Sequence, residues 1–225
     1  MGLMFADIPS LNSLESVFRC MDRPIVHKAL SKLSDKLGDK FPRVIEMIYL
    51  PNLPSSPGKE HLIKSMKYPA VIKVSSSYSG FGKIVVKSES DLDDVDSILH
   101  LHKDYYTIEP FIEHHYEYRL QKIGCNYRAW RKNSDTSWKN NQGNVRVEDH
   151  PWDPKYANWL EECSKLFGGL DMFAIDILHG KDGQEYVIEL NDTGLGLNPD
   201  HEKEDSSFIK QICLEKMSSL EGRNK

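Results

Sequence analysis

The chain has 225 residues, of which 39% are hydrophobic and 28% charged, and its formal net charge at pH 7 is −5. These values are typical of a globular protein with one large domain or two small ones. Its basic residues are dispersed, which argues against nucleic acid as a partner. The four cysteines are scattered and form no Cys-x-x-Cys pair, and no run of residues approaches membrane-spanning length. We therefore expect a cytoplasmic protein with reduced thiols.

The hydrophobic pattern predicts helices over 11–21 and 22–37 and a strand over 44–49. A Pro/Ser/Gly-rich stretch at 51–58 is expected to be a surface loop and an internal boundary. Next come a strand pair around a Ser/Gly loop near residue 80, a helix over 88–103, and β-rich runs at 105–112, 117–123 and 127–131. A helix over 154–167, strands at 172–178 and 185–190, and a helix over 206–220 complete the chain. This order, with antiparallel hairpins and no strict β-α-β alternation, predicts an α+β architecture.

A lysine within an apolar strand is the first chemical signal. Lys73 lies in Ala70-Val71-Ile72-Lys73-Val74, where burial of its ammonium is costly unless an anion meets it. The Ser/Gly loop that follows, with Ser79, Gly80 and Gly82, offers backbone N–H groups to the same anion. The pair predicts a nucleotide phosphate site, although an ordinary hairpin explains the glycines equally well.

A strand pair rich in carboxylates is the second signal. With a turn at 180–183, Asp176 faces Val187 and Ala174 faces Glu189, so that Asp176 and Glu189 are diagonal neighbours about 7–8 Å apart. A hard divalent cation, Mg²⁺ or Ca²⁺, fits between them, with Asn191 as a third oxygen ligand. The alternative is a solvated face whose carboxylates hold no metal.

The segment between these two signals has the features of a nucleoside site. Pro110 interrupts a strand and exposes the backbone of Phe111 and Ile112, which can bind an adenine edge, while Glu113 or Glu117 can accept from ribose hydroxyls. An edge strand with acidic ends explains the segment equally well. The candidates for contact with phosphate or an acidic substrate are Arg119, Lys122, Lys139 and Asn141.

Taken in order, these features resemble the ATP-grasp fold. The amino-acid sequence around them is similar to that of the synapsin family over nearly the whole chain. The matching blocks are Ile8-Pro9-Ser10-Leu11-Asn12-Ser13-Leu14, Ser79-Gly80-Phe81-Gly82-Lys83, Glu109-Pro110-Phe111-Ile112, Arg119-Leu120-Gln121-Lys122-Ile123-Gly124, Trp138-Lys139-Asn140-Asn141, Phe167-Gly168-Gly169-Leu170-Asp171 and His179-Gly180-Lys181-Asp182-Gly183. The resemblance implies two α+β subdomains that clasp ATP, a small one over 51–112 and a large one over 113–225. Residues 1–50 would then be linking helices and the remnant of an amino-terminal lobe that is largely missing.

The resemblance also assigns roles. Lys73 would contact the α- and β-phosphates under a lid at Ser79, Gly80 and Gly82. Adenine would be held by Glu109 with the Phe111 and Ile112 backbone, ribose by Glu113 or Glu117, and the cation by Asp176, Glu189 and Asn191. Arg23 stands where the family usually has an ATP-contacting lysine, and Asp176 replaces a glutamate familiar in some synapsins.

Synapsins are peripheral vesicle-associated proteins that bind ATP, form oligomers and contact actin. The resemblance therefore implies a non-catalytic ATP-binding protein that regulates vesicle clustering and neurotransmitter release. Two alternatives remain open. One is an ATP-dependent carboxylate–amine ligase in which Arg119, Lys139 and Asn141 orient the reactants, and the other is a scaffold that binds no nucleotide.

Overall fold

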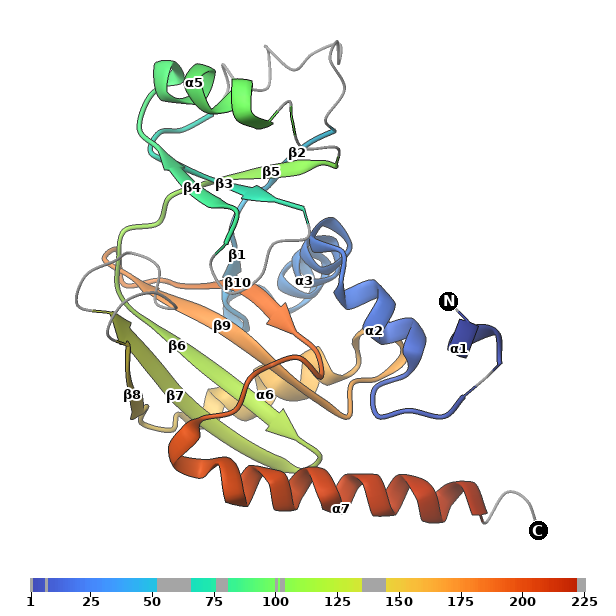
Figure 1. The fold of residues 1–225 in the computed structure, drawn as a ribbon. Helices are drawn as coiled ribbons and strands as arrows, with labels where there is room; N and C mark the ends of the chain where they lie inside the picture. Colours follow the sequence, from blue (N-terminus) through green and yellow to red (C-terminus); the bar gives the residue numbers. More distant parts are fainter. Residues whose placement is uncertain are drawn as a thin grey trace.

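Two β-sheets organise the molecule, one above the other in Figure 1. The computed structural model describes residues 2–6, 8–51, 66–75, 81–99, 101, 104–134 and 145–221. The small sheet has the order β2 (Ile48–Leu50), β5 (Tyr106–Pro110), β3 (Ala70–Val74) and β4 (Lys83–Val86). The large sheet has the order β1 (Arg43–Val44), β10 (Glu185–Asn191), β9 (Met172–Gly180), β6 (His114–Ile123), β7 (Asn126–Ser134) and β8 (Val145–Asp149).

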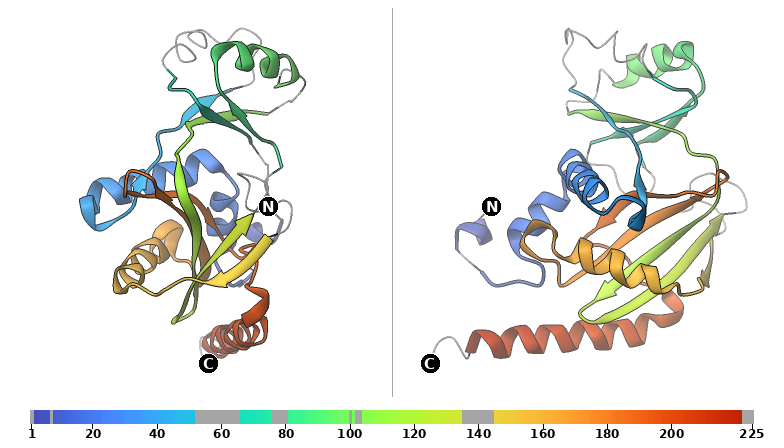
Figure 2. Two further views of the ribbon diagram at one scale, coloured as in Figure 1. Left: turned by 90° about the vertical axis from the view of Figure 1, so that its left-hand side faces the viewer. Right: turned by 180° about the vertical axis from the view of Figure 1, so that it is seen from behind.

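Helices cover both sheets. α5 (Glu89–Leu99) packs on the small sheet through Leu92 and Leu99. α3 (Arg23–Leu37) and α6 (Pro154–Ser164) share a core with one face of the large sheet, and α7 (Glu202–Glu221) packs on the opposite face (Figure 2). The chain also forms α1 (Gly2–Phe5), α2 (Leu14–Cys20) and the 3₁₀ turns η1 (Gly38–Lys40), η2 (Leu166–Gly168) and η3 (Pro199–His201). None of the described helices is long and apolar enough to cross a bilayer.

The ends of α3 follow from its sequence. The Asp22 carboxylate accepts from the Ile25 N–H at 3.0 Å and caps the helix, and Pro24 occupies the first turn, where no helical N–H is needed. Gly38 ends the helix with a φ of +56°, which glycine adopts at little cost. Val26, Leu30 and Leu33 form the buried stripe. The prediction for this helix is confirmed.

The prediction of a single strand over 44–49 is wrong. Two short strands replace it, and they pair with different sheets: β1 lies parallel to β10, whereas β2 lies antiparallel to β5. Residues 45–47 between them belong to neither strand, and the Ile45 carbonyl bonds the His27 ring at 2.8 Å. A short run of residues with high strand propensity predicts one strand, but in the structure its first part pairs with the large sheet and its last part with the small sheet.

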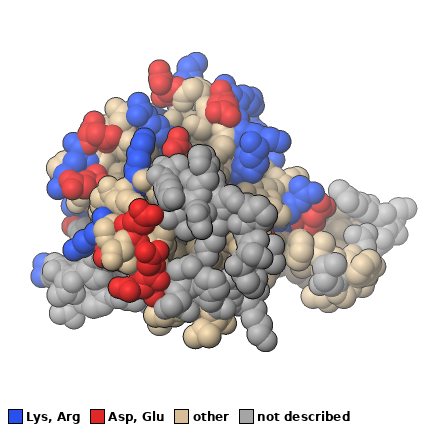
Figure 3. Space-filling view, turned by 90° about the horizontal axis from the view of Figure 1, so that it is seen from above, with Lys and Arg blue, Asp and Glu red and all other residues tan. Residues whose placement is uncertain are grey.

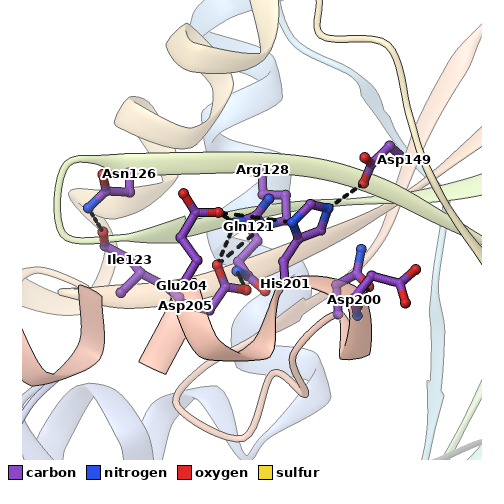
Figure 4. A network of polar contacts seen from close by, with 10 residues as sticks. Gln121, Ile123, Asn126, Arg128, Asp149, Asp200, His201, Glu204 and Asp205 are labelled. Carbon is purple, nitrogen blue, oxygen red and sulfur yellow. Dashed lines mark hydrogen bonds and ion pairs between the residues drawn. The ribbon is translucent and has the colours of Figure 1, made fainter. Parts of the chain in front are cut away.

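The N-terminal end of α7 is fixed to β6 and β7 by a polar network (Figure 4). Arg128 donates to Glu204 at 2.7 Å and to the buried Asp205 at 2.9 Å, and Gln121 donates to the other Asp205 oxygen at 2.8 Å. The β6–β7 turn lies so close to α7 that a Cβ at Gly124 would meet Ile212 at 2.6 Å. This docking holds α7 against the large sheet beside β6, the strand that also carries Arg119.

Candidate functional site

A buried ion pair lies on the small sheet. β3 is hydrogen-bonded to β4 on one side and β5 on the other, and Lys73 in β3 reaches Glu109 in β5 with an Nζ–Oε2 distance of 2.5 Å. Both side chains are less than a tenth exposed. Burial lowers the pKa of Lys73, with nearby Arg23 and Lys83 acting in the same direction and Glu109 opposing them. The anion predicted for this lysine is therefore supplied, in the protein alone, by Glu109.

The β9–β10 hairpin differs from the predicted register. Glu189 lies directly opposite Asp176, and Asn191 lies opposite Ala174, because the turn shifts the register by one residue and a β-bulge between Val187 and Glu189 shifts it by another. The predicted pairing assumed a regular ladder and a four-residue turn, and both assumptions are wrong. The turn closes instead with the Gly180 N–H donating to the Gln184 carbonyl.

The turn and the bulge together place Asp176 and Glu189 directly opposite each other, and not diagonally as the sequence predicts. Directly opposed residues have Cα atoms about 4.5–5.5 Å apart, against about 7–8 Å for diagonal neighbours. Bulges re-aim side chains in this way beside functional sites. Asp176 and Glu189 are therefore nearest neighbours across the hairpin.

Arg119 on β6 binds Asp176 through both carboxylate oxygens. Its Nε and Nη2 donate at 2.6 and 2.7 Å, and the Asn191 amide donates to one of the same oxygens at 3.1 Å. Burial acts to lower the pKa of Arg119, but the Asp176 carboxylate outweighs it and raises that pKa above its ordinary value. The third guanidinium nitrogen of Arg119, Nη1, donates to the Leu195 carbonyl.

Glu189 faces cations from two other elements. Lys83, from β4 of the small sheet, lies 3.7 Å away, and Arg23, the first residue of α3, lies 4.0 Å away. Burial acts to raise the pKa of Glu189, but Lys83, Arg23 and more distant cations outweigh it, so that the pKa is lower than usual. The Lys83–Glu189 contact joins the small sheet to the large one.

A pocket of about 290 Å³ opens at this junction. Ser75 and Glu109 line it from the small sheet, Glu189 and Asn191 from β10, and Arg23 from α3. Viewed from above, this face of the molecule carries both Lys and Arg and Asp and Glu among its described residues (Figure 3). Charged side chains are concentrated at the junction: Arg23, Lys73, Lys83 and Arg119 lie near Glu109, Asp176 and Glu189. Cations beside carboxylate oxygens suit a polyphosphate with its metal ion.

The structure differs from the predicted adenine site at one donor. The Phe111 N–H is not exposed, because it donates to the Pro69 carbonyl at 2.8 Å. The Ile112 carbonyl contacts the His114 ring at 2.9 Å, and Glu113 is exposed and paired with Lys181 at 3.1 Å. Glu117, in β6, lies opposite Leu178 of β9.

The predicted lid is described only in part. Gly82 has a φ of +63°, and its carbonyl accepts from the Val74 N–H at 2.9 Å. Ser79, Gly80, Lys139 and Asn141 lie outside the described residues.

Two basic residues have places that the sequence did not predict. Lys83 has no role in the sequence interpretation, yet it faces Lys73 across the β3–β4 hairpin and contacts Glu189. The sequence feature that could have indicated a role for Lys83 in the site is its position next to Gly82 of the predicted phosphate loop. Lys122, a candidate phosphate ligand, lies instead by α6, 3.3 Å from Glu161.

The donor chemistry at the hairpin fits a hard divalent cation. Asp176, Glu189 and Asn191 bring oxygen atoms to adjacent positions, and such ions bind through one or two carboxylates with phosphate oxygens completing the shell. Among the described residues, no group of three or more His, Cys, Asp or Glu side chains is placed to hold a metal without such help. Arg119 already occupies both Asp176 oxygens, so a cation there has to compete with a guanidinium.

The two stacked sheets and the charged residues where they meet have the arrangement of the ATP-grasp fold. D-alanine–D-alanine ligase from Bacillus anthracis superposes with a TM-score of 0.73 at 18% identity, covering 99% of this chain and 75% of the ligase. The same ligase complexed with ATP gives a TM-score of 0.72 at 16% identity, covering 100% and 75%. Likeness at these identities shows the fold alone.

The sequence comparisons define the family. The family model for the synapsin ATP-binding domain matches residues 12–219. The Drosophila melanogaster protein Synapsin is 33% identical over 226 residues, which cover 98% of this chain. The chain belongs to the synapsin ATP-binding-domain family. It spans 21% of the length of that curated relative.

Proposed function

We propose that the chain binds ATP, with a divalent cation, in the pocket between the small sheet and the β9–β10 hairpin. The observation that carries this proposal is the meeting of Lys73, Lys83, Arg23 and Arg119 around three carboxylates at that junction. A buried lysine and arginine pair with carboxylates when no other anion is present. Phosphate oxygens can replace those carboxylates with charge-assisted hydrogen bonds of similar strength.

In this proposal Lys73, Arg23 and Lys83 bind the phosphates. Lys73 leaves Glu109, while Arg23 and Lys83 leave Glu189, which then becomes available as a cation ligand. Asp176 and Asn191 are the other two proposed cation ligands on the hairpin. The bound cation would neutralise phosphate charge. Because Lys83 belongs to the small sheet and Glu189 to the large one, nucleotide binding changes a contact that joins the two sheets.

The family relationship supports a role for this ATP binding on vesicles. We propose a peripheral vesicle protein of the cytoplasm in which bound ATP and Mg²⁺ or Ca²⁺ tune oligomer assembly and so vesicle clustering and transmitter release. Actin is a further candidate partner. Flotation of the protein with vesicles, with and without ATP, tests this role, and equal flotation in both states contradicts control by nucleotide.

Nucleotide binding itself is tested by thermal unfolding. A ligand that binds only the folded state stabilises it by about 2.7 kcal/mol at a concentration 100 times its Kd. The midpoint temperature should therefore rise with ATP in the presence of Mg²⁺ and not with phosphate alone. An unchanged midpoint at millimolar ATP with either cation contradicts the proposal and favours a scaffold that binds no nucleotide.

Ligase chemistry has a separate signature. A carboxylate–amine ligase releases ADP and phosphate only when an acid and an amine are supplied together. We expect the chain to bind ATP without releasing ADP and phosphate. ADP formation that depends on an added amino acid would contradict a purely ATP-binding role and would identify the chain as a ligase.

A further inference from the structure

An open groove of about 620 Å³ runs along α3 and ends at η2. It lies on the side of the helix away from the nucleotide pocket. At 3.6 residues per turn, Ile25, Lys28 and Lys32 lie roughly opposite Arg23 and His27, which line that pocket. The groove is therefore a separate surface, which we call the α3 groove.

The floor of the α3 groove is apolar. Ile25 is 41% exposed, although most large apolar side chains of α3 face the core. The residues that form the floor are Pro24, Ile25, Ala29, Leu33, Leu166 and Phe167. Apolar surface of this kind, bordered by charge, is typical of sites where another protein docks.

The rim carries charge of one sign. All four charged residues among those that line the groove, namely Arg19, Lys28, Lys32 and Lys36, are cationic, in a chain whose net charge is −5. Arg19 pairs with Glu15 at 2.6 Å, and Lys36 approaches Glu162 at 3.4 Å.

Within the described part of the chain, Lys28 and Lys32 have no ion pair. Like charges four residues apart destabilise a helix slightly, so α3 keeps this row of lysines against a small cost that an anionic partner would remove.

We propose that the α3 groove docks an acidic amphipathic helix of a partner protein. Its apolar side chains would lie on Ile25, Ala29 and Phe167, and its carboxylates would face the lysine row. Lys28, Lys32 and Lys36 are spaced one helical turn apart and span about 12 Å. The matching partner has Asp or Glu at every fourth position beside a row of Leu, Ile or Phe, over about three turns. The apolar floor disfavours nucleic acid, and the recess between α3 and η2 suits a helix better than a lipid surface.

The test is a selection for binding from helix-forming 16-residue peptides displayed on phage, with the purified chain as the target. The predicted result is enrichment of sequences with acids at four-residue spacing beside apolar residues. A synthetic peptide from that set should bind the double variant K28E/K32E at least tenfold more weakly and I25S several-fold more weakly.

The matched control is K203E/K210E, which makes the same change of charge at exposed lysines of α7. It should leave peptide binding unchanged. All these variants should keep the ATP-dependent rise in unfolding temperature, so failure of the groove is distinguishable from failure of the nucleotide site.

Three results overturn the proposal: no enrichment on the wild-type chain, enriched peptides without acidic residues, or equal loss in both double variants. Binding of phosphatidylserine vesicles through Lys28 and Lys32, in the absence of any enriched peptide, would assign the surface to membrane instead.

Discussion

Arg119 binds both carboxylate oxygens of Asp176, at 2.6 and 2.7 Å, across neighbouring strands of the large sheet. The pair is buried, so neither charge is well solvated without the other. The same carboxylate is the proposed cation ligand. Arg119 therefore stabilises the protein without nucleotide and competes with the cation for Asp176.

Replacing Arg119 should reveal this double role. Arg119→Met leaves Asp176 buried without its partner, which we expect to lower the free energy of unfolding by about 3 kcal/mol. Urea denaturation measures the loss, and added Mg²⁺ or Ca²⁺ should restore part of it. The double variant R119M/D176L should recover stability without responding to cations. Wild-type stability in the single variant contradicts the pairing.

Lys73 should be required for ATP binding. We expect Lys73→Met to weaken ATP binding by about 1–3 kcal/mol, because a charge-assisted contact to phosphate is lost. Calorimetric titration measures the affinity. Since the single variant leaves Glu109 buried and unpaired, the double variant K73M/E109L serves as a folded control that should bind ATP equally weakly. Wild-type affinity in both variants would remove Lys73 from the site.

Glu189 should matter only when the cation is present. Glu189→Gln removes a negative ligand, so we expect ATP binding with Mg²⁺ to weaken by about 1–3 kcal/mol. With a chelator, wild type and variant should differ little. Glu215→Gln, which changes an exposed carboxylate of α7, is the matched control. An equal effect of Glu189→Gln with and without cation would exclude Glu189 as a ligand.

His150 should make stability depend on pH. Its ring stacks on Tyr118 at 4.4 Å, and burial, aided by Arg131, lowers its pKa below the usual 6.5. Because the folded-state pKa is the lower one, this contribution to stability is complete above pH 6.5 and is lost as pH falls through the folded-state value. The difference in unfolding temperature between wild type and His150→Gln should therefore shrink between pH 7.5 and 5. A constant difference over that range contradicts the shift.

Local features of the sequence were sufficient to predict most of the helices and strands. Asp22, Pro24 and Gly38 mark both ends of α3, and the β-branched runs mark β3 and β4, because caps and strand propensity act within a few residues. The order of motifs, with Lys73 before the carboxylate hairpin, was sufficient to predict the ATP-grasp fold.

The features that the sequence did not predict depend on contacts between distant segments. The β-bulge before Glu189 changes a register that period-two alternation cannot reveal. The split between β1 and β2 arises because one short run lies against two sheets. Lys83 acquires its place only when the small sheet lies over β10, and nothing in its own neighbourhood indicates that Glu189 is its partner.

The most direct test of the proposed site is calorimetric titration of ATP into the purified chain with Mg²⁺, with Ca²⁺ and with chelator. We predict saturable binding of one ATP that is stronger with a divalent cation and is weaker in Lys73→Met. Absence of binding under all three conditions would contradict the proposed nucleotide site, and binding of equal strength with chelator would contradict the role of Asp176 and Glu189 as cation ligands.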